Sequence, residues 1–318
     1  MPRPIHLDDI HFVISDESAT LRFLRESMGA CEMGHPDRKI DYVRFMSVRY
    51  GHPTLTVTGP VAANEPDALR RDISSLFELY RPPRNAPARY GVRSVVFSTR
   101  DLADAVAVLR ARGVEISAEG EDARLPYEPT AKSASFLGPD GIRLGLVERS
   151  GDRGSRFGID HLVMLTRDAA ATSRFFQQVF SGVESDVGAG TRVIRVADAR
   201  IVLAEPEALG IPRESVRPPA LVPFATPGSG SAPRRQRVPG SIEHLGFLFA
   251  DVPALAAAAE SRGYRADYPP VRYEYAGRLT PYTVTEFSTP DGYGIEAVAV
   301  AGRVGPHAYY EGRFETHE

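Results

Sequence analysis

Apolar residues along the chain form two kinds of pattern. From Leu102 to Leu109 they recur at helical spacing, and the pattern ends at Arg112-Gly113, where a glycine suits a helix C-terminus. Short apolar-rich runs at Ile159–Thr166 and Ile242–Phe249 predict strands. Further short strand patterns follow each helical stretch. The expected unit is therefore strand–helix–strand–strand–strand.

Landmarks in this pattern return at a nearly constant offset. The pairs His11 and His161, Ser94 and His244, and Asp101 and Asp251 are each 150 residues apart, and the Pro-Asp-Gly turn at 139–141 returns at 290–292. The spacing of 83 residues from His11 to Ser94 also separates His161 from His244, so each half repeats again. The sequence thus predicts an α+β fold of four βαβββ modules.

The halves are expected to be two tandem domains. A stretch of Gly, Ser, Asp and Arg at Ser150–Arg156 is typical of a linker. We therefore predict an N-terminal domain of residues 1–152 and a C-terminal domain of residues 153–318, each with two modules. Between Pro206 and Gly240 the module pattern lapses, which predicts either a passive surface loop or a lid over a site.

Composition narrows the function. The 318 residues carry a formal net charge of −3, so no basic surplus favours a nucleic-acid partner. A single cysteine, Cys31, excludes an internal disulfide and a Cys-based zinc site, and fits a reducing cytoplasm. Neither a signal peptide nor a membrane-spanning run is evident, so we expect a cytoplasmic protein without a membrane partner.

One set of residues has metal-binding chemistry. His161 and His244 occupy equivalent places on the first strands of the third and fourth modules, and Glu296 lies on the last strand of the fourth. If adjacent modules pair, the three side chains converge from three strands. Non-haem Fe(II) oxygenases bind their metal through two histidines and one carboxylate and leave the other coordination positions open.

The two halves differ at these positions. Ser94 and Gly145 stand in the first half where His244 and Glu296 stand in the second, so we expect the second half to hold the working site and the first to be degenerate. An alternative pairing remains open, in which the first module joins the fourth. His11 would then replace His161 as the first metal ligand.

These features resemble the vicinal oxygen chelate superfamily. Four such modules with a His–His–Glu set are similar to its two-domain dioxygenases, the type I extradiol enzymes and the 4-hydroxyphenylpyruvate dioxygenases. Residues 201–206 and 90–97 resemble segments of the latter. The resemblance implies that His161, His244 and Glu296 hold Fe(II), with Mn(II) as a substitute.

The sequence also departs from these relatives. It has no histidine between Leu162 and Glu243, where the extradiol enzymes place an acid–base histidine, and Glu286 stands where they have a pocket tyrosine. Tyr282 and Glu286 share strand parity, so proton handling is assigned to these two residues or to the substrate. Glu205 is conceivable as a fourth metal ligand, although Leu203 is the residue that aligns with Glu296.

The favoured function is an Fe(II)-dependent dioxygenase of a small aromatic substrate, catechol-like or hydroquinone-like, or of a 2-oxo acid. Its partners would be that substrate and O2. Whether the protein forms a homo-oligomer is left open. One alternative is an isomerase, epimerase or lyase on the same scaffold, with zinc or nickel. Another is a metal-free binding protein of the resistance type.

Overall fold

The computed structural model of the chain describes most of its residues. The described residues are 2–13, 17–29, 31–33, 44–49, 54–59, 87–119, 125–138, 141–150, 157–219, 221–223, 234–236, 241–273 and 282–300. Among them, no helix has the length and apolar character needed to cross a membrane. The proposed linker at Ser150–Arg156 lies outside the described residues except for Ser150.

Each of the four expected modules contains strands and a helix in the expected order. The first has β1 (His6–Val13), α1 (Glu17–Arg22), the π-helix η1 (Phe23–Ser27), β2 (Cys31–Met33), β3 (Arg44–Arg49) and β4 (Thr54–Gly59). The second has β5 (Gly91–Thr99), α3 (Leu102–Ala111), β6 (Ile116–Glu119), β7 (Ser133–Leu137) and β8 (Arg143–Glu148). The third has β9 (Gly158–Leu165), α4 (Ala169–Phe180), β10 (Val183–Gly188), β11 (Thr191–Val196) and β12 (Ala199–Ala204). The fourth has β15 (Ser241–Leu248), α5 (Val252–Glu260), β16 (Val271–Tyr273), β17 (Tyr282–Ser288) and β18 (Gly294–Val300).

The repeated aspartates begin the helices. Asp101 and Asp251 are the N-cap residues of α3 and α5, and their carboxylates accept hydrogen bonds from the backbone N–H three residues later, each at 2.9 Å. Asp168 caps α4 in the same way, at 2.8 Å. A capping carboxylate satisfies an N–H group that has no partner inside the helix. The repeat in the sequence is therefore a repeat of helix starts.

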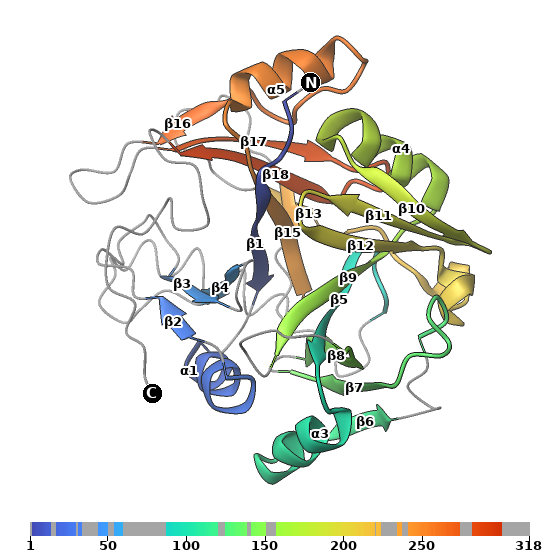
Figure 1. Ribbon diagram of the computed structural model, residues 1–318. Coiled ribbons are helices and arrows are strands. Elements are labelled where there is room, and N and C mark those ends of the chain that lie inside the picture. Colours follow the sequence, from blue (N-terminus) through green and yellow to red (C-terminus); the bar gives the residue numbers. More distant parts are fainter. Residues whose placement is uncertain are drawn as a thin grey trace.

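The modules pair in an order that the expectation of adjacent pairing missed. One sheet has the order β16-β17-β18-β15-β1-β4-β3-β2, so the first module joins the fourth (Figure 1). The other has the order β10-β11-β12-β9-β5-β8-β7-β6 and joins the second module to the third. We call these sheet A and sheet C. The expected pairing of the third module with the fourth is corrected, and its alternative is the one observed.

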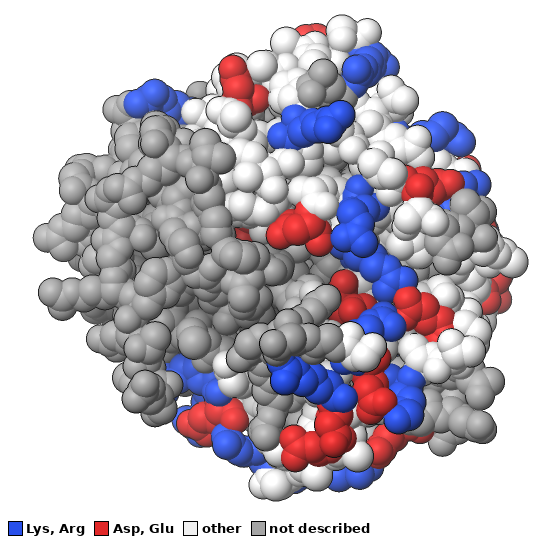
Figure 2. Space-filling view, in the orientation of Figure 1, with Lys and Arg blue, Asp and Glu red and all other residues white. Residues whose placement is uncertain are grey.

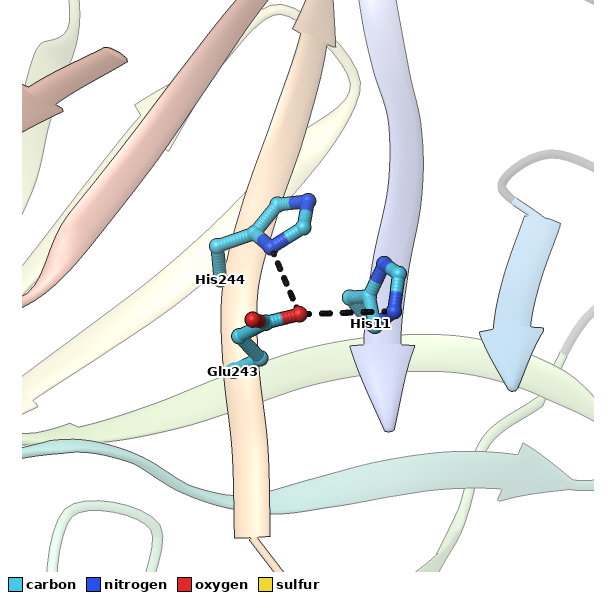
Figure 3. A group of neighbouring side chains, drawn as sticks. All are labelled: His11, Glu243 and His244. Atoms are coloured by element: carbon cyan, nitrogen blue, oxygen red, sulfur yellow. Dashed lines mark ion pairs between the residues drawn. The ribbon is translucent and has the colours of Figure 1, made fainter. Parts of the chain in front are cut away.

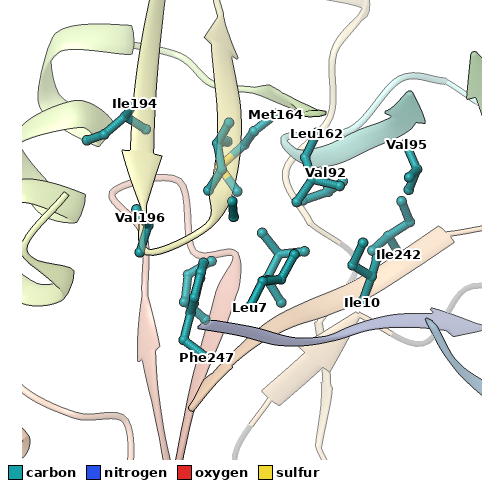
Figure 4. Packing of buried hydrophobic residues seen from close by; sticks show 14 of the residues in the cluster. Leu7, Ile10, Val92, Val95, Leu162, Met164, Ile194, Val196, Ile242 and Phe247 are labelled. Atoms are coloured by element: carbon teal, nitrogen blue, oxygen red, sulfur yellow. The ribbon is translucent and has the colours of Figure 1, made fainter. Parts of the chain in front are cut away.

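The two sheets pack against each other through the middle of the molecule. Figure 4 shows Leu7 and Ile10 of β1 facing residues of β5 and β9, with Val92 and Leu162 among them. These side chains are 7% exposed or less. Their burial removes apolar surface from water and ties together modules that are distant in sequence.

A β-bulge interrupts the alternation in the central strand of sheet A. Ile242, Leu245 and Phe247 all belong to the apolar core, so the first spacing is three residues and the second is two. In the pairing with β1, Phe12 lies opposite Ile242 and Ile10 opposite Leu245, which leaves two residues of β15 facing one of β1. Such a bulge re-aims the extra side chain.

The segment after the third module packs on sheet C. It contains the short helices η3 (Pro206–Leu209) and η4 (Arg213–Ser215) and a hairpin of β13 (Leu221–Pro223) and β14 (Arg234–Gln236). Leu209 packs against the apolar groups that contain Val163 and Leu165. The described first part of the expected loop at 206–240 therefore covers the face of sheet C. On the side of the molecule in Figure 2, acidic and basic side chains lie interspersed over the described surface, as the small net charge leads one to expect.

An aromatic cluster centred on Phe180 joins the two sheets. Phe180 ends α4, which packs on sheet C, yet its ring lies 5.6 Å from Phe247 and 5.8 Å from Phe287 in sheet A, measured between centroids. The side chain is fully buried. Large rings at these separations add edge and stacking contacts to their burial.

We predict that Phe180→Ala destabilises the protein by about 3–5 kcal/mol, because the cavity cannot be filled from either sheet. Urea unfolding followed by circular dichroism measures the change. Val183→Ala, at a residue that is 66% exposed, is the matched control and is expected to change the stability by less than about 1 kcal/mol. A loss below that size in Phe180→Ala would contradict the role of the cluster.

Candidate functional site

Three buried polar side chains meet where β1 pairs with β15. Figure 3 shows His11 on β1 and Glu243 and His244 on β15, with the carboxylate between the two rings. The Oε2 atom of Glu243 lies 3.4 Å from Nε2 of His11 and 3.5 Å from Nδ1 of His244. The two imidazoles are 4.6 Å apart between centroids. The bulge makes this meeting possible, because it turns consecutive residues of β15 toward the same histidine.

Two more carboxylates extend the group across sheet A. Glu296 of β18 has its Oε2 atom 3.9 Å from Nε2 of His244. Glu286 of β17 lies opposite Glu296 in the strand register, so both point to the face that carries His244. Glu286 is only 1% exposed.

A glycine makes room for the second of these carboxylates. Gly294 is the register partner of His244 in β18. The carboxylate of Glu286 occupies the space that a Cβ atom at residue 294 would need. The side chain of Glu286 therefore reaches across β18 toward the histidine, and any larger residue at 294 would displace it.

The residues present fit a divalent metal ion. His11, Glu243 and His244 each offer a ligand atom, and these atoms lie within 4.8 Å of one another. Nitrogen and oxygen atoms that each lie about 2.0–2.2 Å from one ion must lie within a few ångströms of one another, as these three ligand atoms do. Imidazole and carboxylate are ligands that first-row metals accept. A cation here would also offset the free-energy cost of burying several carboxylates on one face.

The structure brings together two of the three expected metal ligands. His244 and Glu296 lie on the same face of sheet A. His161 does not join them, because β9 pairs with β5 and β12 in sheet C. His11, the alternative first ligand, takes the place beside His244 because β1 pairs with β15.

The other expected residues fall in different places. Glu286 lies beside the group, whereas the backbone of Tyr282 begins β17 and its side chain lies outside the described residues. Glu205 is at the end of β12 in sheet C, where its carboxylate contacts Arg213 at 3.1 Å. It is therefore not near the group in sheet A.

His161 has both ring nitrogens engaged in sheet C. Its Nε2 atom lies 2.7 Å from the hydroxyl of Tyr127, and its Nδ1 atom lies 2.7 Å from Oδ2 of Asp160. Arg149 donates two hydrogen bonds to Asp160, at 2.9 and 2.8 Å. Glu128 accepts hydrogen bonds from both Arg149 and Arg200.

Burial and charge set the protonation states of this network. Burial lowers the pKa of His161, although Asp160 opposes the shift, so the imidazole is neutral near pH 7. Burial opposes ionisation of Asp160, but hydrogen bonds from Arg149 and His161 hold the pKa of its carboxyl well below the usual range. Burial, together with Glu128, raises the pKa of Tyr127, so its hydroxyl stays protonated and donates to the neutral ring.

Sequence reasoning missed Glu243 and the partners of His161. Strict alternation assigns Glu243 to the opposite face from His244, and only the spacing of Ile242, Leu245 and Phe247 reveals the bulge. Asp160 precedes His161 directly and carries the same signal, because Ile159 and Leu162 both pack in the core. No sequence pattern indicates Tyr127.

Comparisons with known proteins agree with this architecture. Residues 158–297 match the model of the Glyoxalase/Bleomycin resistance protein/Dioxygenase superfamily. The chain contains a domain of this superfamily. No curated protein sequence matches it.

Solved structures with this fold match nearly the whole length of the chain. Glyoxalase I from Zea mays is similar over 94% of this chain and 92% of its own, with a TM-score of 0.58 and 14% identity. A candidate dioxygenase from Bacillus subtilis is similar over 96% of this chain and 88% of its own, with a TM-score of 0.60 and 12% identity. At these identities the likeness concerns the fold.

The superfamily match lies across both sheets. Residues 158–297 include the third module, which lies in sheet C, and most of the fourth, which lies in sheet A. His11 is outside the matched segment. The group in sheet A is therefore completed by a residue that the superfamily match alone does not reach.

We predict that His161 makes the stability of the protein depend on pH. Its pKa is lower in the folded protein than in the unfolded chain, so the unfolded chain binds more protons and stability declines as the pH falls through about 6.5. His161→Gln is expected to reduce the difference in unfolding free energy between pH 7 and pH 5. Urea unfolding at the two pH values measures it.

Tyr127→Phe serves as the control for this measurement. It keeps the imidazole buried and removes one hydrogen bond, so it should lower stability by about 1 kcal/mol at pH 7 and keep the pH dependence. Equal pH dependence in the wild type and in His161→Gln would show that the histidine does not act in this way.

Proposed function

We propose that the protein is an Fe(II)-dependent dioxygenase whose metal is held by His11, His244 and Glu296. The observation that supports this most directly is the meeting of two buried histidines from the first and fourth modules on a face that also carries Glu296. The expected substrate, a small catechol-like or hydroquinone-like aromatic compound or a 2-oxo acid, follows from the resemblance to dioxygenases. Such a substrate carries oxygen atoms that can bind a metal.

The strand register favours a site with open positions. His11 pairs with Thr56 in β4, as His244 pairs with Gly294 in β18. Thr58 therefore occupies the register position in β4 that Glu296 occupies in β18. A symmetric site would have a second carboxylate ligand at this position of β4, but the residue there is a threonine. Two histidines and one carboxylate leave room for other ligands.

An Fe(II) ion bound here would supply the electron-transfer chemistry that lets O2 react with an organic substrate. The chain's own residues shape the surroundings. His11, Glu243, His244 and Glu286 are 3% exposed or less, so the floor of the site is shielded from bulk water. Glu286, buried beside this group, would take a proton from a substrate hydroxyl. It would do the work that the absent acid–base histidine does in extradiol relatives.

A metal-dependent isomerase is the second candidate, and one observation favours it. Glu243 lies as close to the two histidines as a ligand would, so it can act as a fourth protein donor. Such a set leaves fewer open positions and needs no O2. In the dioxygenase, the same carboxylate would instead accept a hydrogen bond from an imidazole and orient it.

We predict that His11→Ala, His244→Ala and Glu296→Ala each lose most of the bound metal, because each removes a donor atom. His161→Ala is the matched control and should keep it, since His161 lies in sheet C. Elemental analysis of anaerobically purified protein gives the metal and its amount. Circular dichroism checks that each variant is folded.

Two further measurements separate the candidate functions. Oxygen consumption with candidate substrates is expected of the dioxygenase alone, and Glu243→Gln should keep the iron in that case. Turnover without O2, with loss of metal in Glu243→Gln, would establish the isomerase instead. A wild-type protein that binds no metal would contradict both candidate functions.

We predict that Glu286→Gln lowers turnover about 10²–10⁴-fold while the metal content stays unchanged, because the variant keeps its size and loses its base. Gly294→Ala should have a similar effect by displacing the carboxylate of Glu286. Val183→Ala, at a residue that is 66% exposed and away from the group, controls for a small substitution. Unchanged turnover in Glu286→Gln with metal bound would remove Glu286 from the mechanism.

A further inference from the structure

Sheet C repeats the framework of sheet A with different side chains. The second and fourth modules begin with β5 and β15, and both strands have core residues at spacings of three and two. These residues are Val92, Val95 and Phe97 in β5 and Ile242, Leu245 and Phe247 in β15. The register of β5 with β9 is also shifted just after Val92. Positions in the two sheets therefore correspond one to one.

The residues of sheet C that correspond to the acidic group of sheet A carry the opposite charge. Ser94 pairs with Arg143 as His244 pairs with Gly294, and Ser135 pairs with Gly145 as Glu286 pairs with Glu296. The counterparts in sheet C of Glu243, His244, Glu286, Gly294 and Glu296 are therefore Arg93, Ser94, Ser135, Arg143 and Gly145. Three carboxylates are lost, and two arginines are gained.

The two arginines lie close to each other. Burial, with a further contribution from the charge of Arg143, lowers the pKa of Arg93 to about 10. Arg93 is half-buried and Arg143 is exposed. No carboxylate of the described residues forms an ion pair with either one. By contrast, Arg149 and Arg200, elsewhere on sheet C, are both held by Glu128 and Asp160.

The neighbouring strands supply hydrogen-bond donors on the same face. Ser94 and Ser135 are partly exposed and lie on the same face as the arginines, since Val95, Ala134 and Phe136 beside them point into the core. The middle of this face is closed, because Tyr127 and Leu125 pack over Val96 and Val163. Arg143 is exposed, so solvent reaches the end of the face where the two arginines lie.

We propose that Arg93 and Arg143, with the hydroxyls of Ser94 and Ser135, form a binding site for a small oxyanion. Its ligand is a molecule with a carboxylate or a phosphate group. A guanidinium presents paired N–H donors that match two oxygens of either group, and two guanidiniums near each other attract an anion more than one does. An anion between them also removes their mutual repulsion. The group in sheet A is built for a cation, and its duplicate is built for an anion.

Calorimetric titration of the full-length protein tests the site. The probes are inorganic phosphate and malonate, which separate the two ligand groups. The protein is first stripped of metal and then freed of the chelator, because chelators themselves carry carboxylates. At least one probe is expected to bind saturably at one site per chain. Arg93→Gln and Arg143→Gln should each weaken that binding at least about tenfold. Arg174→Gln, on the exposed side of α4, removes an equal charge and should not weaken it.

Thermal unfolding separates anion binding from a structural role. The bound anion should raise the Tm of the wild type. Arg93→Gln removes a partly desolvated charge, so its Tm without anion should be at least that of the wild type, and the anion should not raise it further. If neither probe binds saturably, or if binding is equally strong in Arg143→Gln, whose exposed side chain is not needed for folding, the proposal is wrong.

Discussion

The antiparallel pairing of β1 with β15 is the contact on which the candidate site depends. It joins residues near the start of the chain to residues 228–242 positions later, so the contact must repay the entropy of closing a very long loop. It does so through core residues on both strands, among them Leu7, Ile10 and Phe247. The same pairing leaves His11 opposite the bulge of β15. The core contact and the polar group are therefore two faces of one strand pair.

Much of this fold can be predicted from the sequence, because its signals are local. The helical spacing from Leu102 to Leu109 depends only on neighbours in the chain, and helix α3 is observed there. Alternation also places His244, Glu286 and Glu296 on one face correctly. It states which face of a strand a residue occupies, but it says nothing about which strand lies beside it.

The choice between His11 and His161 lies beyond local signals for that reason. The two histidines are equivalent in the repeat, and either module completes a sheet with the fourth. The structure separates them by strand order, and the partners of His161 then become intelligible. A buried imidazole needs hydrogen bonds at both nitrogens. Tyr127 and Asp160 provide them, so a histidine inherited by duplication serves as a structural link in sheet C.

The bulges explain how one framework carries two opposite charges. The core spacing of three and two residues is kept in β5 and β15, so the backbone presents two consecutive side chains to the outer face in both sheets. What those side chains are is nearly independent of the core, because they do not pack in it. Exchange of Glu243 for Arg93 and of Gly294 for Arg143 reverses the field on that face while the apolar residues beneath stay in place. The constraint that matters for chemistry is thus the position of the bulge. Once it is set, charged residues on the outer face determine whether a cation or an anion is favoured.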